Sequence, residues 1–317
     1  MLKPPAEISL SESQVRELLA ADCPEYAHLP LHLVAEGWDN AVWRLGDDLA
    51  VRLPRRAVAA ELIRHEQQAL PLLATRTAVP VPLPLCVGAP RGPMPWPWSV
   101  VPWFPGRALL AVPRSARGSV AAPLAAFLRA VHAPAPPDAP RNPVRGVPLA
   151  ARSGAVEERL AGGLVPRSEE LRRVWEEALA APLFDGEPVW IHGDLHPGNI
   201  VVNGAERGVE RAAEHPAPAA APSLAAVVDF GDVTAGDPAT DLAAAWLCFD
   251  PAGRRAFRSA YGGDDSALWV RARGWAVVLA TALCGNSLDD PQMARLGHET
   301  VDEVLARGEG GRVRFVP

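Results

Sequence analysis

The sequence predicts an α+β fold divided into two lobes. Short apolar runs separated by Gly- and Asp-containing turns fill most of the N-terminal third, and helical patterns dominate after Gly106. The chain has 317 residues, of which 49% are hydrophobic, so it can bury one large core or two smaller ones. We place a small, β-rich lobe at residues 1–102 and a larger, mainly helical lobe at 103–317, with a linker at about 99–103.

The N-terminal lobe is predicted to start with a helix and a strand meander. Residues 11–21 carry apolar side chains at helical spacing behind Ser11, which is a suitable N-cap. Residues 57–74 form a second helical pattern, which Pro71 should bend or interrupt. Between the two helices, short apolar runs separated by turns predict antiparallel strands at 31–35, 41–45 and 49–53.

The later part of the chain combines short strands with many helices. Residues 80–87 alternate with proline, which favours an edge strand or an extended segment, and the strand-like run 98–103 leads into the linker. Residues 134–148 should form a Pro-rich surface loop, and residues 204–222 a long mobile insertion. Further strands are expected at 189–191, 200–203 and 225–230, and helices at 120–132, 171–181, 241–249, 254–261, 267–284 and 291–307.

Composition narrows the classes of function. A net charge of −6 disfavours non-specific attraction to nucleic acid. The N-terminus lacks the apolar core of a secretion signal, and Arg, Pro or Gly interrupts the longest apolar stretches before they reach membrane-spanning length. We therefore expect a cytoplasmic protein, monomeric or dimeric, without nucleic-acid or membrane partners. The cysteines form no CxxC pair, which favours reduced thiols at Cys23, Cys86, Cys248 and Cys284.

Two polar clusters are suited to phosphoryl transfer. This reaction needs metal on the phosphates, a carboxylate at the attacking hydroxyl and cations that neutralise developing charge. In the loop His192 to Asn199, Asp194 can accept a hydroxyl proton and Asn199 offers an oxygen to Mg²⁺. The second cluster, Asp229-Phe230-Gly231-Asp232, ends an apolar strand, where a carboxylate is costly unless it is paired or binds metal. Asp229 is therefore a candidate ligand of the same ion.

These residues resemble the catalytic centre of the aminoglycoside phosphotransferase and choline kinase superfamily, which has a protein-kinase-like fold. The loop His192-Gly193-Asp194-Leu195-His196-Pro197-Gly198-Asn199 is similar to its H-G-D-x-x-x-x-N motif, and Asp229-Phe230-Gly231 to its metal-binding strand end. The segment Gly236-Asp237-Pro238-Ala239-Thr240-Asp241-Leu242-Ala243 is also similar. The resemblance is strong over 189–245, weaker over 37–73 and mostly architectural elsewhere. It implies an ATP- or GTP-dependent small-molecule O-phosphotransferase.

The resemblance also implies a role for each matching residue of the C-terminal lobe. Asp194 would be the catalytic base, and Asn199 and Asp229 would be the Mg²⁺ ligands. His192 would brace the loop, and Asp241 would hold the C-terminal lobe to it.

In the N-terminal lobe, the resemblance implies a nucleotide site. Arg52 stands where a kinase has its nucleotide-binding lysine on the third strand, so it would contact the α- and β-phosphates. Glu66 on the following helix would pair with Arg52, with Glu61 as the fallback partner. The backbone of the linker, around Val101, would hydrogen-bond the purine.

Two features depart from the family's pattern. Arginine at position 52 keeps the positive charge of the usual lysine and adds a second donor arm, but its reach differs. The phosphate-covering loop has one glycine, Gly37, in place of three. Asn40 and backbone N–H groups must therefore hold the phosphates, and the choice between ATP and GTP stays open.

Two alternatives to a phosphotransferase follow from the same residues. His192-x-Asp194-x-His196 resembles half of a zinc site, which would indicate a metallohydrolase, although other His ligands such as His215 and His298 are scattered. A catalytically inactive pseudokinase would be expected to lack Asp194, Asn199 or Asp229, and all three are present.

The acceptor stays open. The Trp-rich C-terminal helices suit a macrolide, and choline, homoserine or a sugar are further candidates. No activation-loop signature of protein kinases lies between Asp229 and Asp241, which disfavours a protein substrate. A polycationic aminoglycoside is favoured by acidic residues on the C-terminal helices: Asp250, Asp264, Asp265, Asp289, Asp290, Glu299, Asp302 and Glu303.

Overall fold

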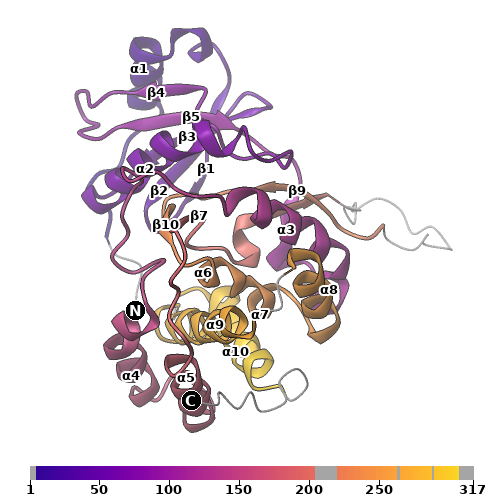
Figure 1. The fold of residues 1–317 in the computed structure, drawn as a ribbon. Helices are drawn as coiled ribbons and strands as arrows, with labels where there is room; N and C mark the ends of the chain where they lie inside the picture. Colours follow the sequence, from indigo (N-terminus) through magenta and orange to yellow (C-terminus); the bar gives the residue numbers. More distant parts are fainter. Residues whose placement is uncertain (1–4, 204–219, 263–264, 288, 307–317) are drawn as a thin grey trace, which may run out of the picture.

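The structure is a computed structural model that describes residues 5–203, 220–262, 265–287 and 289–306. A β-rich N-terminal part stands on a helical C-terminal part, which confirms the predicted α+β fold (Figure 1). Most of the insertion predicted at 204–222 lies outside the described residues, as does His215.

The N-terminal sheet has five strands in the order β1-β2-β3-β5-β4, and all neighbours are antiparallel. The linker run forms β5 (Trp98–Pro102), which lies between β3 and β4. Only β4 (Cys86–Gly88) forms a strand in the Pro-containing stretch, because proline cannot donate to a strand ladder. The predicted meander is confirmed as β1 (Leu31–Glu36), β2 (Asn40–Leu45) and β3 (Leu49–Pro54).

Two helices accompany this sheet. Helix α1 (Glu12–Asp22) starts with a capping box, in which the Ser11 hydroxyl accepts the Gln14 N–H at 3.4 Å and the Gln14 side chain accepts the Ser11 N–H at 2.9 Å. Helix α2 (Ala57–Leu73) runs through Pro71, so the helix is not interrupted there, and a bend at Pro71 stays a prediction. Pro71 lies in the last turn, so the helical hydrogen bond that its missing N–H cannot make is lost only two residues before the helix ends.

Ten helices and several short strands appear along the described chain, and α9 (Ser266–Asn286) is the longest helix. By length and composition α9 could cross a membrane, but 72% of its apolar window is buried inside the protein, as in a core helix. The helix predicted at 241–249 is divided in two. The other C-terminal helices are α3 (Gly118–Val131), α4 (Ser153–Ala161), α5 (Ser168–Leu179), α6 (Ala239–Leu242), α7 (Ala244–Cys248), α8 (Pro251–Tyr261) and α10 (Pro291–Leu305).

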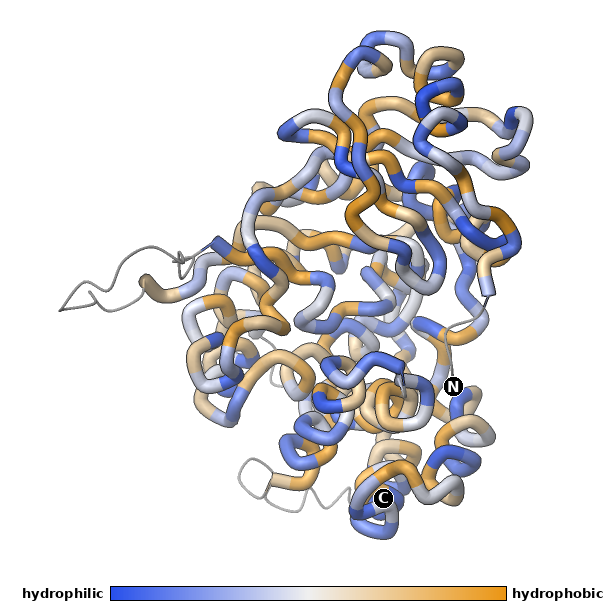
Figure 2. Tube along the Cα trace, turned by 180° about the vertical axis from the view of Figure 1, so that it is seen from behind, coloured by the Kyte–Doolittle hydropathy of each residue, from blue (hydrophilic) through white to orange (hydrophobic). Residues whose placement is uncertain are grey.

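Two hydrophobic cores hold the described residues together. The smaller one joins α1 to the N-terminal sheet around Trp43 and Trp98, and the larger one fills the helical part. Hydrophobic residues accordingly follow the strands and inner helices, while surface loops are mostly hydrophilic (Figure 2). Three tryptophans of the C-terminal helices are buried in the larger core, with exposed fractions of 6% for Trp246, 5% for Trp269 and 0% for Trp275. The lobe boundary at residue 102 stays a prediction.

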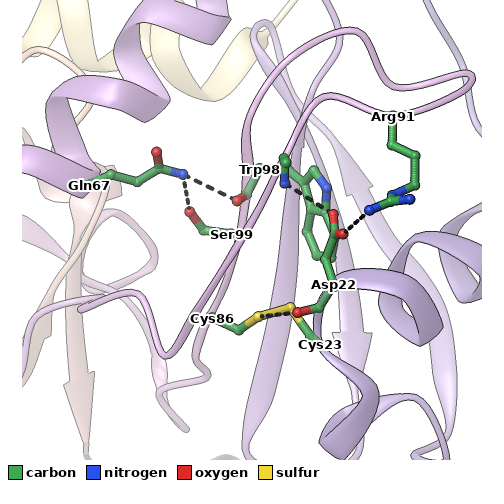
Figure 3. Close-up of a disulfide and its surroundings, with 8 residues drawn as sticks. Asp22, Cys23, Gln67, Cys86, Arg91, Trp98 and Ser99 are labelled. Carbon is green, nitrogen blue, oxygen red and sulfur yellow. Dashed lines mark hydrogen bonds and ion pairs between the residues drawn. A yellow bond between two sulfur atoms is a disulfide. The ribbon is translucent and has the colours of Figure 1, made fainter.

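A disulfide links α1 to the N-terminal sheet. Cys23, at the end of α1, is bonded to Cys86 of β4, and their Cα atoms are 6.1 Å apart (Figure 3). The adjacent Asp22 reinforces this junction, because its carboxylate accepts the Ala89 N–H at 3.0 Å and the Arg91 guanidinium at 2.9 Å. The prediction of reduced thiols is therefore wrong for this pair. The two cysteines are 63 residues apart, and sequence spacing reveals only local pairs.

Candidate active site

The candidate catalytic loop, His192 to Asn199, lies between two small groups of strands. β7 (Val189–Ile191) leads into the loop and pairs with β10 (Thr234–Gly236). β8 (Ile200–Asn203) leaves the loop and pairs with β6 (Arg107–Ala108) and β9 (Ser223–Val227). These pairings place the loop beside the Asp229 segment, which follows β9.

Gly193 packs tightly against that segment. Its φ is +86°, and a Cβ atom there would lie 2.3 Å from the backbone oxygen of Asp232. Only glycine combines this backbone conformation with such a contact. Steric constraints alone therefore require glycine at the second position of the H-G-D motif, independently of any catalytic role.

A buried carboxylate, Asp241 in α6, fixes the start of the catalytic loop. Its two oxygens accept the backbone N–H groups of His192 at 2.7 Å and Gly193 at 2.9 Å. His132 Nε2 lies 3.1 Å from the same carboxylate. Burial works to raise the pKa of Asp241, but the His132 contact and the backbone donors lower it below its ordinary value. The structure thus contains the contact that we expected of Asp241.

His192 braces the loop and has no ring nitrogen to spare. Its Nδ1 accepts the Asp194 N–H at 3.2 Å, and its Nε2 lies 3.0 Å from the Val228 carbonyl oxygen. The ring also contacts Phe230, at 4.5 Å between centroids. His192 is fully buried, so it holds the loop rather than meeting a substrate or a zinc ion. Within the described ranges, no three His, Cys, Asp or Glu side chains gather to hold a metal.

Asp194 presents its carboxylate at the surface of the loop. The side chain is 30% exposed, its Oδ1 accepts Nη2 of Arg145 at 2.7 Å, and its Oδ2 lies 3.7 Å from Nε2 of His196. Burial works to raise the pKa of Asp194, but Arg145, followed by the two neighbouring histidines, lowers it below its ordinary value. The carboxylate is therefore ionised at neutral pH and can accept a hydrogen bond from a hydroxyl group.

Asn199 and Asp229 each carry a side-chain oxygen that can serve as a metal ligand. Asn199 Nδ2 donates to the Asp194 carbonyl at 3.0 Å, which leaves its own side-chain oxygen for a ligand. Asp229 has a φ of 65°, which is unusual for a residue other than glycine, and its side chain is 54% exposed. Mg²⁺ commonly takes one or two protein oxygens together with phosphate oxygens, so this pair of residues fits such an ion.

Arg52 of β3 joins the N-terminal sheet to the catalytic centre. Its Nη1 contacts both oxygens of Glu66 in α2, at 2.6 and 2.7 Å, and its Nη2 lies 3.0 Å from Oδ1 of Asp229. Burial works to lower the pKa of Arg52, but the two carboxylates outweigh it and raise the pKa. The pairing predicted with Glu66 is present, whereas Glu61, the fallback partner, is exposed and pairs with Arg64.

The turn predicted to cover the phosphates connects β1 to β2. The Gly37 N–H donates to the Asn40 carbonyl at 2.8 Å, and Arg55, just after β3, donates to the Gly37 carbonyl at 2.8 Å. Arg56 pairs with Asp39 in the same turn. The Asn40 side-chain oxygen is buried and finds no donor among the residues that the structure describes. Gly37 thus lies in the turn and Asn40 at the start of β2, directly after it, and their contact with phosphate stays a prediction.

The linker begins as a strand that is firmly held in the sheet. Val101 is 4% exposed and stands opposite Ala50 of β3. From α2, Gln67 Nε2 donates to the Trp98 carbonyl at 3.2 Å and to Ser99 Oγ at 2.9 Å (Figure 3). The helix that carries Glu66 is thereby tied to the linker strand. Purine binding by the Val101 backbone stays a prediction.

Arg145 and Asn142 also lie at this centre, although both are in the segment 134–148 that was predicted to be a surface loop. Arg145 Nη2 also lies 3.6 Å from Oδ2 of Asp232, whose Oδ1 accepts Asn142 Nδ2 at 2.6 Å. Burial raises the pKa of Asp232, so the two carboxyl groups beside Arg145 are shifted in opposite directions. The need for charge-neutralising cations was the one signal that could have drawn attention to this arginine.

A cavity of about 720 Å³ lies beside Arg145. Its walls are mainly proline, alanine and valine side chains from residues 135–147, together with Pro188 and Ala235. The ionisable residues that line it are Arg141, Arg145 and Glu187. The cavity is therefore largely apolar, and one of its lining residues, Arg145, donates a hydrogen bond to Asp194.

Comparison with known proteins agrees with this arrangement. The sequence profile of the phosphotransferase enzyme family matches residues 30–213 and 214–275. No curated protein sequence gives a significant match. Among solved structures, the GDP complex of wild-type aminoglycoside 2'-phosphotransferase-IIIa is 21% identical, with a TM-score of 0.68 over 93% of this chain and 99% of that chain.

Two further solved structures share the fold. The streptomycin-ATP-APH(2")-IIa ternary complex is 16% identical, with a TM-score of 0.56 over 92% of this chain and 95% of that chain. The apoenzyme of macrolide 2'-phosphotransferase MphH from Brachybacterium faecium is 23% identical, with a TM-score of 0.57 over 94% of this chain and 99% of that chain. These likenesses show a common fold, and the family profile spans most of the sequence. The chain is a phosphotransferase that belongs to the phosphotransferase enzyme family.

Proposed function

We propose that the chain transfers the γ-phosphoryl group of ATP or GTP to a hydroxyl group of an aminoglycoside-like or other antibiotic. The observation that carries this proposal is the contact between Arg52 and Asp229, at 3.0 Å, next to the loop with Asp194. It joins the nucleotide-binding arginine of the sheet to the oxygens that fit Mg²⁺. Solved relatives hold GDP in one case and ATP with streptomycin in another, which supports a nucleotide donor and an antibiotic acceptor.

In the proposed reaction, the oxygen of the acceptor hydroxyl attacks the γ-phosphorus, and Asp194 accepts the proton that this hydroxyl loses. A bond forms between that oxygen and phosphorus, and the bond to the β–γ bridging oxygen breaks. The electron pair of the broken bond leaves with the nucleoside diphosphate. Mg²⁺ held by Asn199 and Asp229 would supply positive charge to the phosphate oxygens. Arg52, held by its ion pair with Glu66, binds the α- and β-phosphates.

A macrolide is the second candidate acceptor, and the cavity beside Arg145 favours it. The cavity walls are largely apolar, and two of the three ionisable residues are arginines, which would repel a polycation. The acidic C-terminal helices give less support to an aminoglycoside than their composition indicates. Three of their carboxylates cap helices instead of forming a binding surface: Asp250, Asp265 and Asp290.

A panel of acceptors tests the proposal. The protein is supplied with Mg²⁺, ATP or GTP, and kanamycin, gentamicin, streptomycin, erythromycin, choline, homoserine or a hexose, one at a time. Formation of nucleoside diphosphate and a mass gain of one phosphoryl group on the acceptor are measured. We expect an antibiotic to be phosphorylated. Turnover of a metabolite alone would contradict the antibiotic assignment, and the absence of any phosphorylated acceptor would contradict the whole proposal.

A further inference from the structure

Arg145 is bonded to the catalytic carboxylate but lies outside the motifs that define the family resemblance. Its Nη2 donates to Oδ1 of Asp194 at 2.7 Å and lies 3.6 Å from Oδ2 of Asp232. The side chain is 16% exposed, and its Nε is buried without a hydrogen-bond partner among the described residues. Because this guanidinium is largely shielded from water, its charge depends on the adjacent carboxylates of Asp194 and Asp232 for stabilisation.

The backbone that carries Arg145 is fixed from two sides. Asn142 Oδ1 accepts the N–H groups of Val144 at 2.9 Å and Arg145 at 3.1 Å, and its Nδ2 reaches Asp232 at 2.6 Å. Thr234 Oγ1, in β10, accepts the Asn142 N–H at 3.1 Å. Asn142 therefore fixes the backbone that carries the Arg145 side chain, and it connects this backbone to Asp232 in the segment after Asp229.

Gly146 closes the arrangement on the other side of Arg145. Its φ is +66°, and a Cβ atom there would lie 3.1 Å from Cα of Gly236 and 3.0 Å from the Ile191 side chain. The chain is thus pressed against β10 and β7 immediately after Arg145. This close packing favours a guanidinium with one fixed position over a mobile surface arginine.

The two oxygens of Asp194 are left in different surroundings. Oδ1 is held by Arg145, while Oδ2 lies 3.7 Å from His196 Nε2, beyond the normal length of a hydrogen bond. Only Oδ2 therefore has room to accept a hydroxyl proton. Without Arg145, the Asp194 and Asp232 carboxylates would face each other as like charges, and the Asp194 side chain would be free to turn.

We propose that Arg145 is a positioning residue for Asp194: it holds one carboxylate oxygen so that the other faces the acceptor hydroxyl. This inference rests on the proposed function, since it assigns a role within that transfer. It differs from a purely structural role in which the same ion pair only ties residues 134–148 to the catalytic loop. A structural role predicts lost stability, whereas a positioning role predicts a lower kcat in folded protein.

The variants Arg145→Met and Arg145→Lys separate these roles, with Arg254→Met as the matched control. Arg254 makes an ion pair with Glu303 at 2.9 Å between α8 and α10, and its side chain is 5% exposed. The assay uses the nucleotide and the acceptor that the wild type turns over fastest in the panel above. Thermal unfolding and nucleotide binding are measured for every variant.

We expect Arg145→Met to lower kcat about a hundredfold, because misplacement of a catalytic group by about 1 Å has that effect. Kd for the nucleotide should stay within about threefold of wild type, because Arg145 bonds Asp194 and Asp232 and not the residues proposed to hold the nucleotide. The fall in kcat is the deciding readout, since Arg145 also lines the cavity proposed for a macrolide and KM for such an acceptor reports the loss of that wall residue. Arg145→Lys should recover part of kcat through its single charged donor. Arg254→Met should lose stability and keep its kcat.

Several results would overturn the inference. Folded Arg145→Met with kcat close to wild type would do so, and so would a Lys variant no better than the Met variant. If Arg145→Met does not fold, the Lys variant decides, and a wild-type kcat in that variant rejects the positioning role. A wild type that phosphorylates no acceptor would remove the proposed function itself, which distinguishes that failure from a failure of the Arg145 inference.

Discussion

Reduction of the Cys23–Cys86 disulfide should destabilise the N-terminal lobe substantially. The bond closes a loop between cysteines 63 residues apart, and the loop-closure entropy of such a loop corresponds to about 4 kcal/mol at 25 °C. Domains of this kind have total unfolding free energies of about 5–15 kcal/mol. The bond therefore contributes a large share of the stability, and the protein should be sensitive to the redox state of its compartment.

Urea unfolding followed by tryptophan fluorescence measures this contribution, because Trp43 and Trp98 are buried in the core beside the bond. Wild type with and without reductant is the matched comparison, since reduction leaves every side chain in place. A Cys23→Ala, Cys86→Ala variant serves as the control and should not respond to reductant. If reductant leaves the unfolding free energy of the wild type unchanged, the bond does not stabilise the lobe and our reasoning fails.

Three further predictions concern the catalytic centre. Glu66→Gln should cost about 3 kcal/mol and weaken nucleotide binding, because it removes one of the two negative charges that pair with the buried Arg52. The exposed Glu61→Gln should change neither the stability nor the nucleotide affinity, and a thermal-shift titration measures both. Gly193→Ala should abolish turnover, because its Cβ would lie 2.3 Å from the Asp232 backbone oxygen. In the control Gly118→Ala, the new Cβ would have no atom within 4 Å, so this variant should keep its activity and unfold at or above the wild-type temperature. Equal activities of the two variants would contradict the packing argument. The lowered pKa of Asp241 stabilises the fold above its unfolded pKa of about 3.8 and loses that effect as pH falls through the folded pKa. Asp241→Asn should therefore be less stable than wild type at pH 7, and a deficit that did not shrink in acid unfolding experiments would contradict this linkage.

The sequence was most informative where chemistry depends on short spacing. His192, Asp194 and Asn199 stand on one loop, and strands on both sides restrict how that loop can run, so their proximity follows from the motif alone. The pairing of Arg52 with Glu66 was expected from the family resemblance, which left Glu61 as a fallback, and the structure contains the Glu66 pair. The turn with Gly37 and the strand meander were predictable from turn residues and apolar alternation.

The remaining contacts depend on how distant segments fold onto one another. Arg145 and Asp194 are 49 residues apart, and the arginine lies in a Pro-rich segment whose composition indicates only a loop. Cys23 and Cys86 meet because α1 packs against the sheet, which no cysteine spacing can reveal. The helix is not interrupted at Pro71 for another reason, since the effect of a proline depends on how far it lies from the helix end.

The most direct test of the proposed mechanism is the turnover of Asp194→Asn, which keeps the shape of the side chain and removes its charge. We predict that kcat falls by about a hundredfold or more, which is the usual effect of losing a general base. Kd for the Mg²⁺-bound nucleotide should stay within about threefold of wild type. The measurement uses the best nucleotide and acceptor of the wild type, followed by quench-flow or steady-state product formation. A variant that binds nucleotide normally and phosphorylates its acceptor at a rate near wild type would contradict the assignment of Asp194 as the catalytic base.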